Sequence, residues 1–256
     1  MSEAPLSLTG LAEAPVTPDQ SAPDVRHPPF VLAAMAALAG AVLVLAILGR
    51  TIAGGSRFAF DSNIMLAFRQ DGNLAIPAGP AWLKQAMIDV TALGGETVLT
   101  LAAAVTIGFL IASRHLLAAA LVLAGTVTGS IAVALVKNWV GRERPALVDH
   151  LVEVGSASFP SGHAANSAII YLTIALLSIQ VITHRAARWF LFVVTLLLVA
   201  AIGVSRVYLG VHWPSDVLAG WSFGALWALA WWAAGSWLRL RLARPVAGED
   251  EGGTSA

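Results

Sequence analysis

Six apolar stretches separated by short polar segments constrain the fold of this chain more than any other feature. A helix that crosses a bilayer needs about 20 mostly apolar residues. The stretches that meet or approach this length are Phe30–Leu48, Thr97–Ala112, His115–Val136, Ala164–Ile182, Trp189–Val204 and Val217–Leu238. Only 12% of the 256 residues are charged, against about 25% in a typical soluble domain. The sequence therefore predicts an all-α integral membrane bundle of six transmembrane helices.

The connection between the first two stretches, residues 50–96, is too polar to cross a membrane. Apolar residues recur in its second half at helical spacing, namely Leu83, Ala86, Met87, Val90 and Leu93. A second short helix is predicted over Asp61–Arg69, with Ile64, Met65 and Phe68 on its buried edge. One-sided apolar patterns of this kind indicate helices that lie at the membrane surface. We expect short interfacial helices between spans one and two.

The two ends of the chain differ in composition from its middle. Residues 1–29 are rich in Pro, Ala and Ser and lack the basic start and apolar core of a signal peptide. Residues 244–256 are rich in Gly, Glu and Ser. Such segments bury too little apolar surface to fold. We expect disordered tails at 1–29 and 244–256 around a membrane domain at 30–243.

Six crossings would place both ends of the chain on one side of the membrane. That side also carries short basic segments, with Arg114, His184, Arg185, Arg188, Arg239 and Arg241. Basic residues beside spans favour the cytoplasm. A count of basic residues alone does not decide the orientation, because four cations lie at the opposite ends of the spans. We expect cytoplasmic termini in a bacterial plasma membrane, with the opposite cluster serving function.

Three polar segments hold most of the polar residues close to the spans: 137–145, 158–163 and 205–216. Helices alternate in direction across a membrane, so all three segments are predicted to emerge on the same, extracytoplasmic face. Their cations are Lys137, Arg142, Arg144 and Arg206. Ser161 and Gly162 lie at a predicted helix start, where free backbone N–H groups and the helix dipole favour an anion. Arginine forks match phosphate oxygens, so the sequence predicts a phosphate site.

Two histidines divide the remaining chemistry in this interpretation. His212 precedes Asp216 by four residues across a Trp-Pro helix start, so the carboxylate can reach one ring nitrogen. The other nitrogen is then free to attack phosphorus. His163 would lie on the opposite side of the phosphorus, protonate the leaving oxygen and later activate water. We expect His212 to be the nucleophile and His163 the general acid and base.

These motifs resemble the type 2 phosphatidic acid phosphatase superfamily. Its pattern is Lys, six residues, Arg-Pro; then Pro-Ser-Gly-His; then Ser-Arg, five residues, His, three residues, Asp. The matching positions are Lys137, Arg144, Pro145, Pro160, Ser161, Gly162, His163, Ser205, Arg206, His212 and Asp216. The resemblance implies hydrolysis without metal or cofactor, with phosphate bound by Lys137, Arg144, Ser161, Gly162 and Arg206. Arg142 lies outside the pattern and is expected to be an electrostatic helper, and Ser205 is a secondary site residue.

The expected substrate is a membrane lipid phosphate or diphosphate that enters sideways from the bilayer. Candidates are undecaprenyl diphosphate, phosphatidylglycerol phosphate and phosphatidic acid, with undecaprenyl diphosphate favoured by an outward-facing site. The 15 basic and 15 acidic residues balance, so nucleic acid is not an expected partner. Two alternatives stay open: a lipid phosphotransferase that uses the same phosphohistidine, and an anion transporter without chemistry.

Overall fold

The structure is a computed structural model that describes residues 29–56 and 58–242. The predicted tails, 1–29 and 244–256, lie outside the described residues except for Pro29, which begins the first helix. The predicted domain limits therefore stay predictions.

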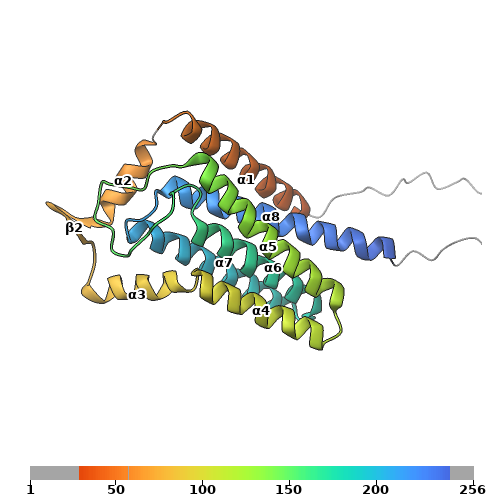
Figure 1. Cartoon of the computed structure of the whole chain (residues 1–256). Helices are drawn as coiled ribbons and strands as arrows, with labels where there is room; N and C mark the ends of the chain where they lie inside the picture. The colour runs from red at the N-terminus through yellow and green to blue at the C-terminus, as the bar shows by residue number, and fades with distance from the viewer. Residues whose placement is uncertain (1–28, 57, 243–256) are drawn as a thin grey trace, which may run out of the picture.

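In the described part of the chain, six long helices form a bundle, and short elements cover one end of it (Figure 1). The long helices are α1 (Pro29–Ala53), α4 (Glu96–Ala112), α5 (Leu116–Val140), α6 (Gly162–Val181), α7 (Arg185–Tyr208) and α8 (Pro214–Leu242). The short elements are α2 (Ala59–Ala67), the antiparallel strands β1 (Arg69–Gln70) and β2 (Asn73–Pro77), and α3 (Ala81–Ala92). Helix α6 lies inside the bundle and packs against α4, α5, α7 and α8.

Length and composition make α5, α7 and α8 candidate membrane spans. Helices α3 and α4 pass the same test as a pair that bends by 44° at residues 93–95, and α1 and α6 contain shorter apolar segments. Large apolar side chains on the outside of the bundle are highly exposed, including Phe109 (68%) and Leu135 (63%). An apolar outer surface of this kind requires lipid as its solvent. The chain is a mostly helical, multi-pass membrane protein.

Helices α6 and α8 approach each other closely because small residues line their contact. A Cβ atom at Gly224 would lie 2.5 Å from Ala168 Cβ and 2.6 Å from the Ala165 carbonyl oxygen. One at Gly220 would lie 2.8 Å from the Ser161 carbonyl oxygen. Small residues let helix backbones pack closely inside a membrane, where packing rather than water exclusion drives association. This contact fixes the start of α6 against the start of α8.

The structure confirms helices in the connection between α1 and α4 and corrects their details. Leu83, Ala86, Met87 and Val90 lie on the inner face of α3, as their spacing predicts. Leu93 follows the helix and is 40% exposed. Ile64 on α2 is 42% exposed, so its assignment to the buried edge was wrong. The predicted helix 61–69 is shifted to 59–67. The hairpin of β1 and β2 was not predicted, because its strands are too short to show a period of two.

Gly224→Ala should destabilise the bundle, because the added methyl group overlaps both Ala168 and Ala165 on α6. Overpacking of this kind costs about 1–3 kcal/mol. The thermal unfolding midpoint in detergent measures the effect. Gly108→Ala is the matched control, because a Cβ at Gly108 meets no atom within 4 Å. Equal midpoints for the two variants would contradict the packing described here.

Candidate active site

Two glycines in the left-handed conformation bring the polar segments together. Gly141 has φ +61°, ends α5 and donates its N–H to the carbonyl oxygen of Lys137, which lies in the last turn. Gly210, with φ +78°, turns the chain between α7 and α8 just before His212. Glycine adopts this conformation without steric cost. The segment after α5, the start of α6 and the connection between α7 and α8 therefore meet at one end of the bundle.

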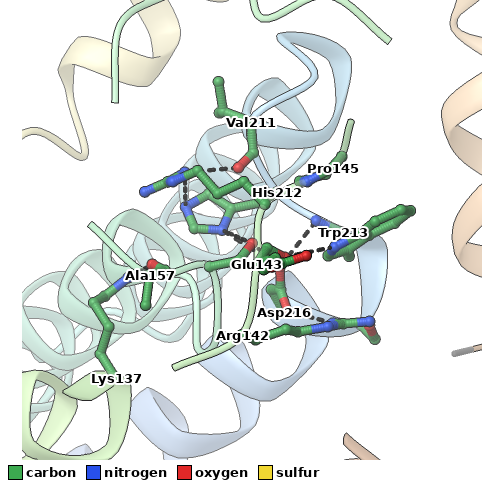
Figure 2. Close-up of polar contacts among 12 residues, drawn as sticks. Lys137, Arg142, Glu143, Pro145, Ala157, Val211, His212, Trp213 and Asp216 are labelled. Atoms are coloured by element: carbon green, nitrogen blue, oxygen red, sulfur yellow. Dashed lines mark hydrogen bonds and ion pairs between the residues drawn. The ribbon is translucent and has the colours of Figure 1, made fainter. Parts of the chain in front are cut away.

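His212 and Asp216 are both buried and face each other. His212 Nδ1 lies 3.6 Å from Asp216 Oδ2, which is too long for a hydrogen bond but short enough for a strong electrostatic interaction. Ser158 connects the pair: its hydroxyl donates to Asp216 Oδ2 at 2.5 Å and lies 3.4 Å from His212 Nδ1. The predicted pairing of His212 with Asp216 is present in the geometry, with a serine that the sequence did not single out (Figure 2).

The other ring nitrogen of His212 faces a cation. His212 Nε2 lies 3.3 Å from Arg144 Nη1, and Arg144 has donors only. Nε2 must therefore accept this hydrogen bond, which leaves the ring proton on Nδ1, on the side of Ser158 and Asp216. This tautomer keeps the lone pair of Nε2 available for attack.

Burial controls the protonation of His212. The pKa of His212 is lowered to about 4, because burial and the nearby Arg144 and Arg206 lower it more than Asp216 raises it. The ring is therefore neutral throughout the physiological pH range. A nucleophilic nitrogen has to be unprotonated, so this environment suits attack on phosphorus.

Lys137 and Arg144 hold the loop that carries Ser158. Lys137 Nζ donates to the Ala157 carbonyl oxygen at 2.7 Å, and Arg144 Nε donates to the Ser156 carbonyl oxygen at 2.7 Å. Arg144 Nη1 also donates to the Val211 carbonyl oxygen at 2.6 Å, next to His212. Both cations thus lie at the site and order its backbone (Figure 2).

Two buried donors beside His212 have no hydrogen-bond partner in the described part of the chain. They are Ser161 Oγ, at the start of α6, and Arg206 Nε, in the last turn of α7. Buried polar groups without partners are rare in native proteins. Lys137, Arg144 and Arg206 also lie within electrostatic range of one another, and their mutual repulsion favours an anion among them. The arrangement fits a phosphate held by cations and by the helix start of Gly162.

His163 lies on the second residue of α6 and lines a groove together with Lys137 and Gly162. It is within electrostatic range of His212 and Arg206. The break between α3 and α4 packs against it, because a Cβ at Gly94 would lie 3.4 Å from His163 Cβ. His163 therefore lies at the end of the groove that also holds Lys137 and Gly162.

Two predicted helper residues behave differently. Arg142 Nη1 donates to Asp216 Oδ1 at 2.5 Å and thus reaches the carboxylate that faces His212. The Ser205 hydroxyl donates to the Ile202 carbonyl oxygen at 2.6 Å within its own helix, which leaves it out of the polar cluster. Thr91 on α3, which sequence reasoning did not assign to the site, accepts a hydrogen bond from Arg206 Nη1 at 3.1 Å.

Comparison with known proteins places these residues in a family context. Residues 115–239 match the PAP2 superfamily. Phosphatidylglycerophosphatase B of Bacillus subtilis is 32% identical over 146 residues, which cover 57% of this chain and 71% of that protein. An undecaprenyl-diphosphatase of Sulfolobus acidocaldarius is 41% identical over 68 residues, 27% of this chain and 29% of that protein.

The fold is also similar to a solved structure. The crystal structure of a transmembrane PAP2 type phosphatidylglycerolphosphate phosphatase from Bacillus subtilis superposes with a TM-score of 0.66 at 25% identity. The superposition covers 81% of this chain and 98% of that one. The superposition therefore extends beyond residues 115–239, the segment that matches the family.

Thr91→Val should weaken anion binding, because it removes the hydroxyl that accepts a hydrogen bond from Arg206 Nη1. The size of the side chain stays the same. The loss of one such hydrogen bond costs about 0.5–1.5 kcal/mol, a roughly twofold to tenfold rise in Kd. Orthovanadate, which mimics five-coordinate phosphorus, is the probe. Thr91→Ser keeps the hydroxyl and should bind like the parent. A valine variant that binds vanadate as tightly as the parent would show that Thr91 does not support Arg206.

Proposed function

The chain belongs to the PAP2 superfamily and is a membrane phosphatase of lipid phosphates, and from this premise we propose that it acts through a phosphohistidine on His212. One observation carries the proposal: the unprotonated Nε2 of a neutral, buried His212 faces Arg144 in the cationic cluster. Lys137, Arg144, Arg206, Ser161 and the N–H groups at Gly162 then hold the phosphate. Charge stabilisation and positioning of this kind supply most of the catalysis of phosphoryl transfer.

In the first step the Nε2 lone pair attacks phosphorus and the bond from phosphorus to the leaving oxygen breaks. The negative charge of the bound phosphate offsets the surrounding cations and favours the protonated form of His163. This form donates a proton to the leaving oxygen, so the lipid leaves as an alcohol or a protonated phosphate. The phosphorylated His212 ring carries positive charge, and Asp216 stabilises it through the Nδ1 side. Only this chain's side chains take part.

In the second step water attacks the phosphorus of phosphohistidine. His163, now neutral, accepts a proton from this water, and the bond from phosphorus to Nε2 breaks. Inorganic phosphate leaves, and both histidines return to their starting states. We propose that the reaction needs no metal and no cofactor, because the cations that neutralise the phosphate are side chains.

A groove of about 660 Å³ between α4, α5 and α6 supports a lipid as the substrate. Lys137, Gly162 and His163 lie at its polar end. Most of the other lining residues are apolar, among them Ala103, Ala104, Ile107, Leu123, Val127 and Val133, and the polar residues between them are Glu96, Thr100, Thr126, Ser130 and Asn166. A phosphate at the polar end would leave its lipid chain in contact with these walls. The groove therefore fits sideways entrance from the bilayer, as the sequence led us to expect.

We further propose that α1, α4, α5, α6, α7 and α8 each cross the membrane once. Each contains one of the six apolar stretches. The helix ends that carry the site then lie at one face of the membrane. We assign that face to the outside of a bacterial plasma membrane, which places the termini in the cytoplasm. The membrane domain would extend over 30–243 with the tails outside it.

Phosphatidylglycerol phosphate becomes the first substrate to test. The Bacillus subtilis relative, of which 71% is covered, and the solved structure, of which 98% is covered, are both named for this activity, whereas the similarity to an undecaprenyl-diphosphatase covers 29% of that protein. Phosphatidic acid and undecaprenyl diphosphate complete the set. The transporter alternative is not favoured, because a transport site would lie near the middle of the membrane and these residues lie at helix ends.

His212→Ala should reduce phosphate release from these three lipids by at least about 1,000-fold, because the nucleophile is lost. Asp216→Ala should have a smaller effect, since the ring remains. The assay uses purified protein in detergent, without added metal and without an acceptor alcohol. His115→Ala, at the exposed opposite end of α5, is the control. Full release by His212→Ala would refute the mechanism, and strict dependence on an acceptor would indicate a phosphotransferase.

Ala104→Trp should block the groove for long chains and raise KM for phosphatidylglycerol phosphate roughly tenfold, because the indole fills space that the chain needs. Hydrolysis of the small soluble ester p-nitrophenyl phosphate should stay within about twofold of the parent. Val105→Trp is the matched control, since Val105 does not line the groove and is 63% exposed. Equal effects on the long lipid and the soluble ester would contradict a tail-binding groove.

A further inference from the structure

Asp61 is a buried carboxylate that the three motifs do not include. It lies on α2, is 1% exposed and precedes residues 115–239, the part that matches the family. An ionised carboxylate is costly to bury unless charges and hydrogen bonds compensate it. Its partners therefore show what the side chain does.

The start of α8 supplies two of these partners. The backbone N–H of Ser215 donates to Asp61 Oδ1 at 2.8 Å, and the Ser215 hydroxyl donates to Asp61 Oδ2 at 2.6 Å. Ser215 is the second residue of α8, and its N–H has no partner within the helix. Asp61 thus caps α8 from a distant part of the chain, at the turn that carries Asp216.

Arg142 supplies the third partner and connects Asp61 to Asp216. Arg142 Nη2 lies 3.0 Å from Asp61 Oδ2, and Nη1 lies 2.5 Å from Asp216 Oδ1. The guanidinium also lies over the Trp213 ring, 5.5 Å from its centroid. Two carboxylates that hold the two ends of one guanidinium fix its orientation. Figure 2 shows Arg142 on the side of Asp216 away from Lys137.

The two carboxylate oxygens of Asp216 therefore have different partners. Oδ1 accepts from Arg142, whereas Oδ2 accepts from Ser158 and from the Trp213 N–H and faces His212. Asp61, Arg142 and Asp216 together carry a net charge of −1. That surplus lies beside the ring that becomes positive in the phosphohistidine.

We propose that Asp61 is a positioning residue of the phosphatase, which orients Arg142 and thereby holds the Asp216 carboxylate against His212. The inference rests on the function proposed above and extends the machinery to α2. Loss of the Asp61 charge makes the group of Asp61, Arg142 and Asp216 neutral. Arg142 then forms its ion pair with Asp216 alone, which draws the Asp216 carboxylate away from His212. Turnover then falls while substrate binding by Lys137, Arg144 and Arg206 persists.

Asp61→Asn tests this, because it keeps the size and an acceptor for the Ser215 N–H and removes the charge. We expect kcat on phosphatidylglycerol phosphate to fall at least about tenfold with KM within about twofold. Rates are divided by the fraction of protein that binds orthovanadate, so unfolded molecules do not count. Asp71→Asn, an exposed site of the same connection, is the matched control and should match the parent.

Arg142→Gln breaks the same connection from its other side and should lower kcat to a similar degree. The kcat of the double variant should lie within about twofold of the kcat of the slower single variant, because both substitutions remove the same interaction. The Arg142→Gln single variant also keeps the test decisive if Asp61→Asn does not fold.

A kcat within about twofold of the parent in Asp61→Asn or in Arg142→Gln would overturn the inference. So would fully additive losses in the double variant, because they would mean that the two residues act separately. These results leave the proposed function intact. If the parent releases no phosphate, or His212→Ala keeps its activity, the proposed function fails and the inference falls with it.

Discussion

The site depends on one buried carboxylate, Asp216. Its oxygens accept hydrogen bonds from the Ser158 hydroxyl, the Trp213 N–H and Arg142, and its backbone carbonyl oxygen accepts from the Ser161 N–H. These contacts join the loop before α6, the start of α6 and the start of α8. A buried charge with this many donors is stable as the anion, whereas removal of a donor would leave it poorly compensated. The chemistry of His212 and the packing of the bundle end thus depend on the same group.

The place of this site in the bundle suits a substrate that never leaves the membrane. Cations and histidines lie at helix ends, and the groove between α4, α5 and α6 continues from Lys137 and His163 along mostly apolar walls. Charges deep in the bilayer would be costly, whereas charges at its surface are not. In the proposed function, the cationic site binds the phosphate head group, and the adjoining groove between α4, α5 and α6 binds the lipid chain.

Much of this could be predicted from the sequence. Long apolar stretches predicted the helices, and alternation of direction predicted that Lys137, His163 and His212 would meet. The contribution of α2 could not be predicted, because Asp61 looks like an ordinary acidic residue in a helix's first turn. Thr91 and Ser158 were missed for a similar reason, since their roles depend on distant partners. Ser205 fits the motif, yet its hydroxyl bonds within α7.

The account depends most on a covalent bond between phosphorus and His212 Nε2. Rapid quenching of the protein with ³²P-labelled phosphatidylglycerol phosphate, followed by peptide mapping, tests it directly. We predict alkali-stable and acid-labile label on the peptide that contains His212, which forms and decays at rates consistent with turnover. Phosphate release at the same rate with no labelled enzyme at any quench time, or with label on another residue, would contradict it.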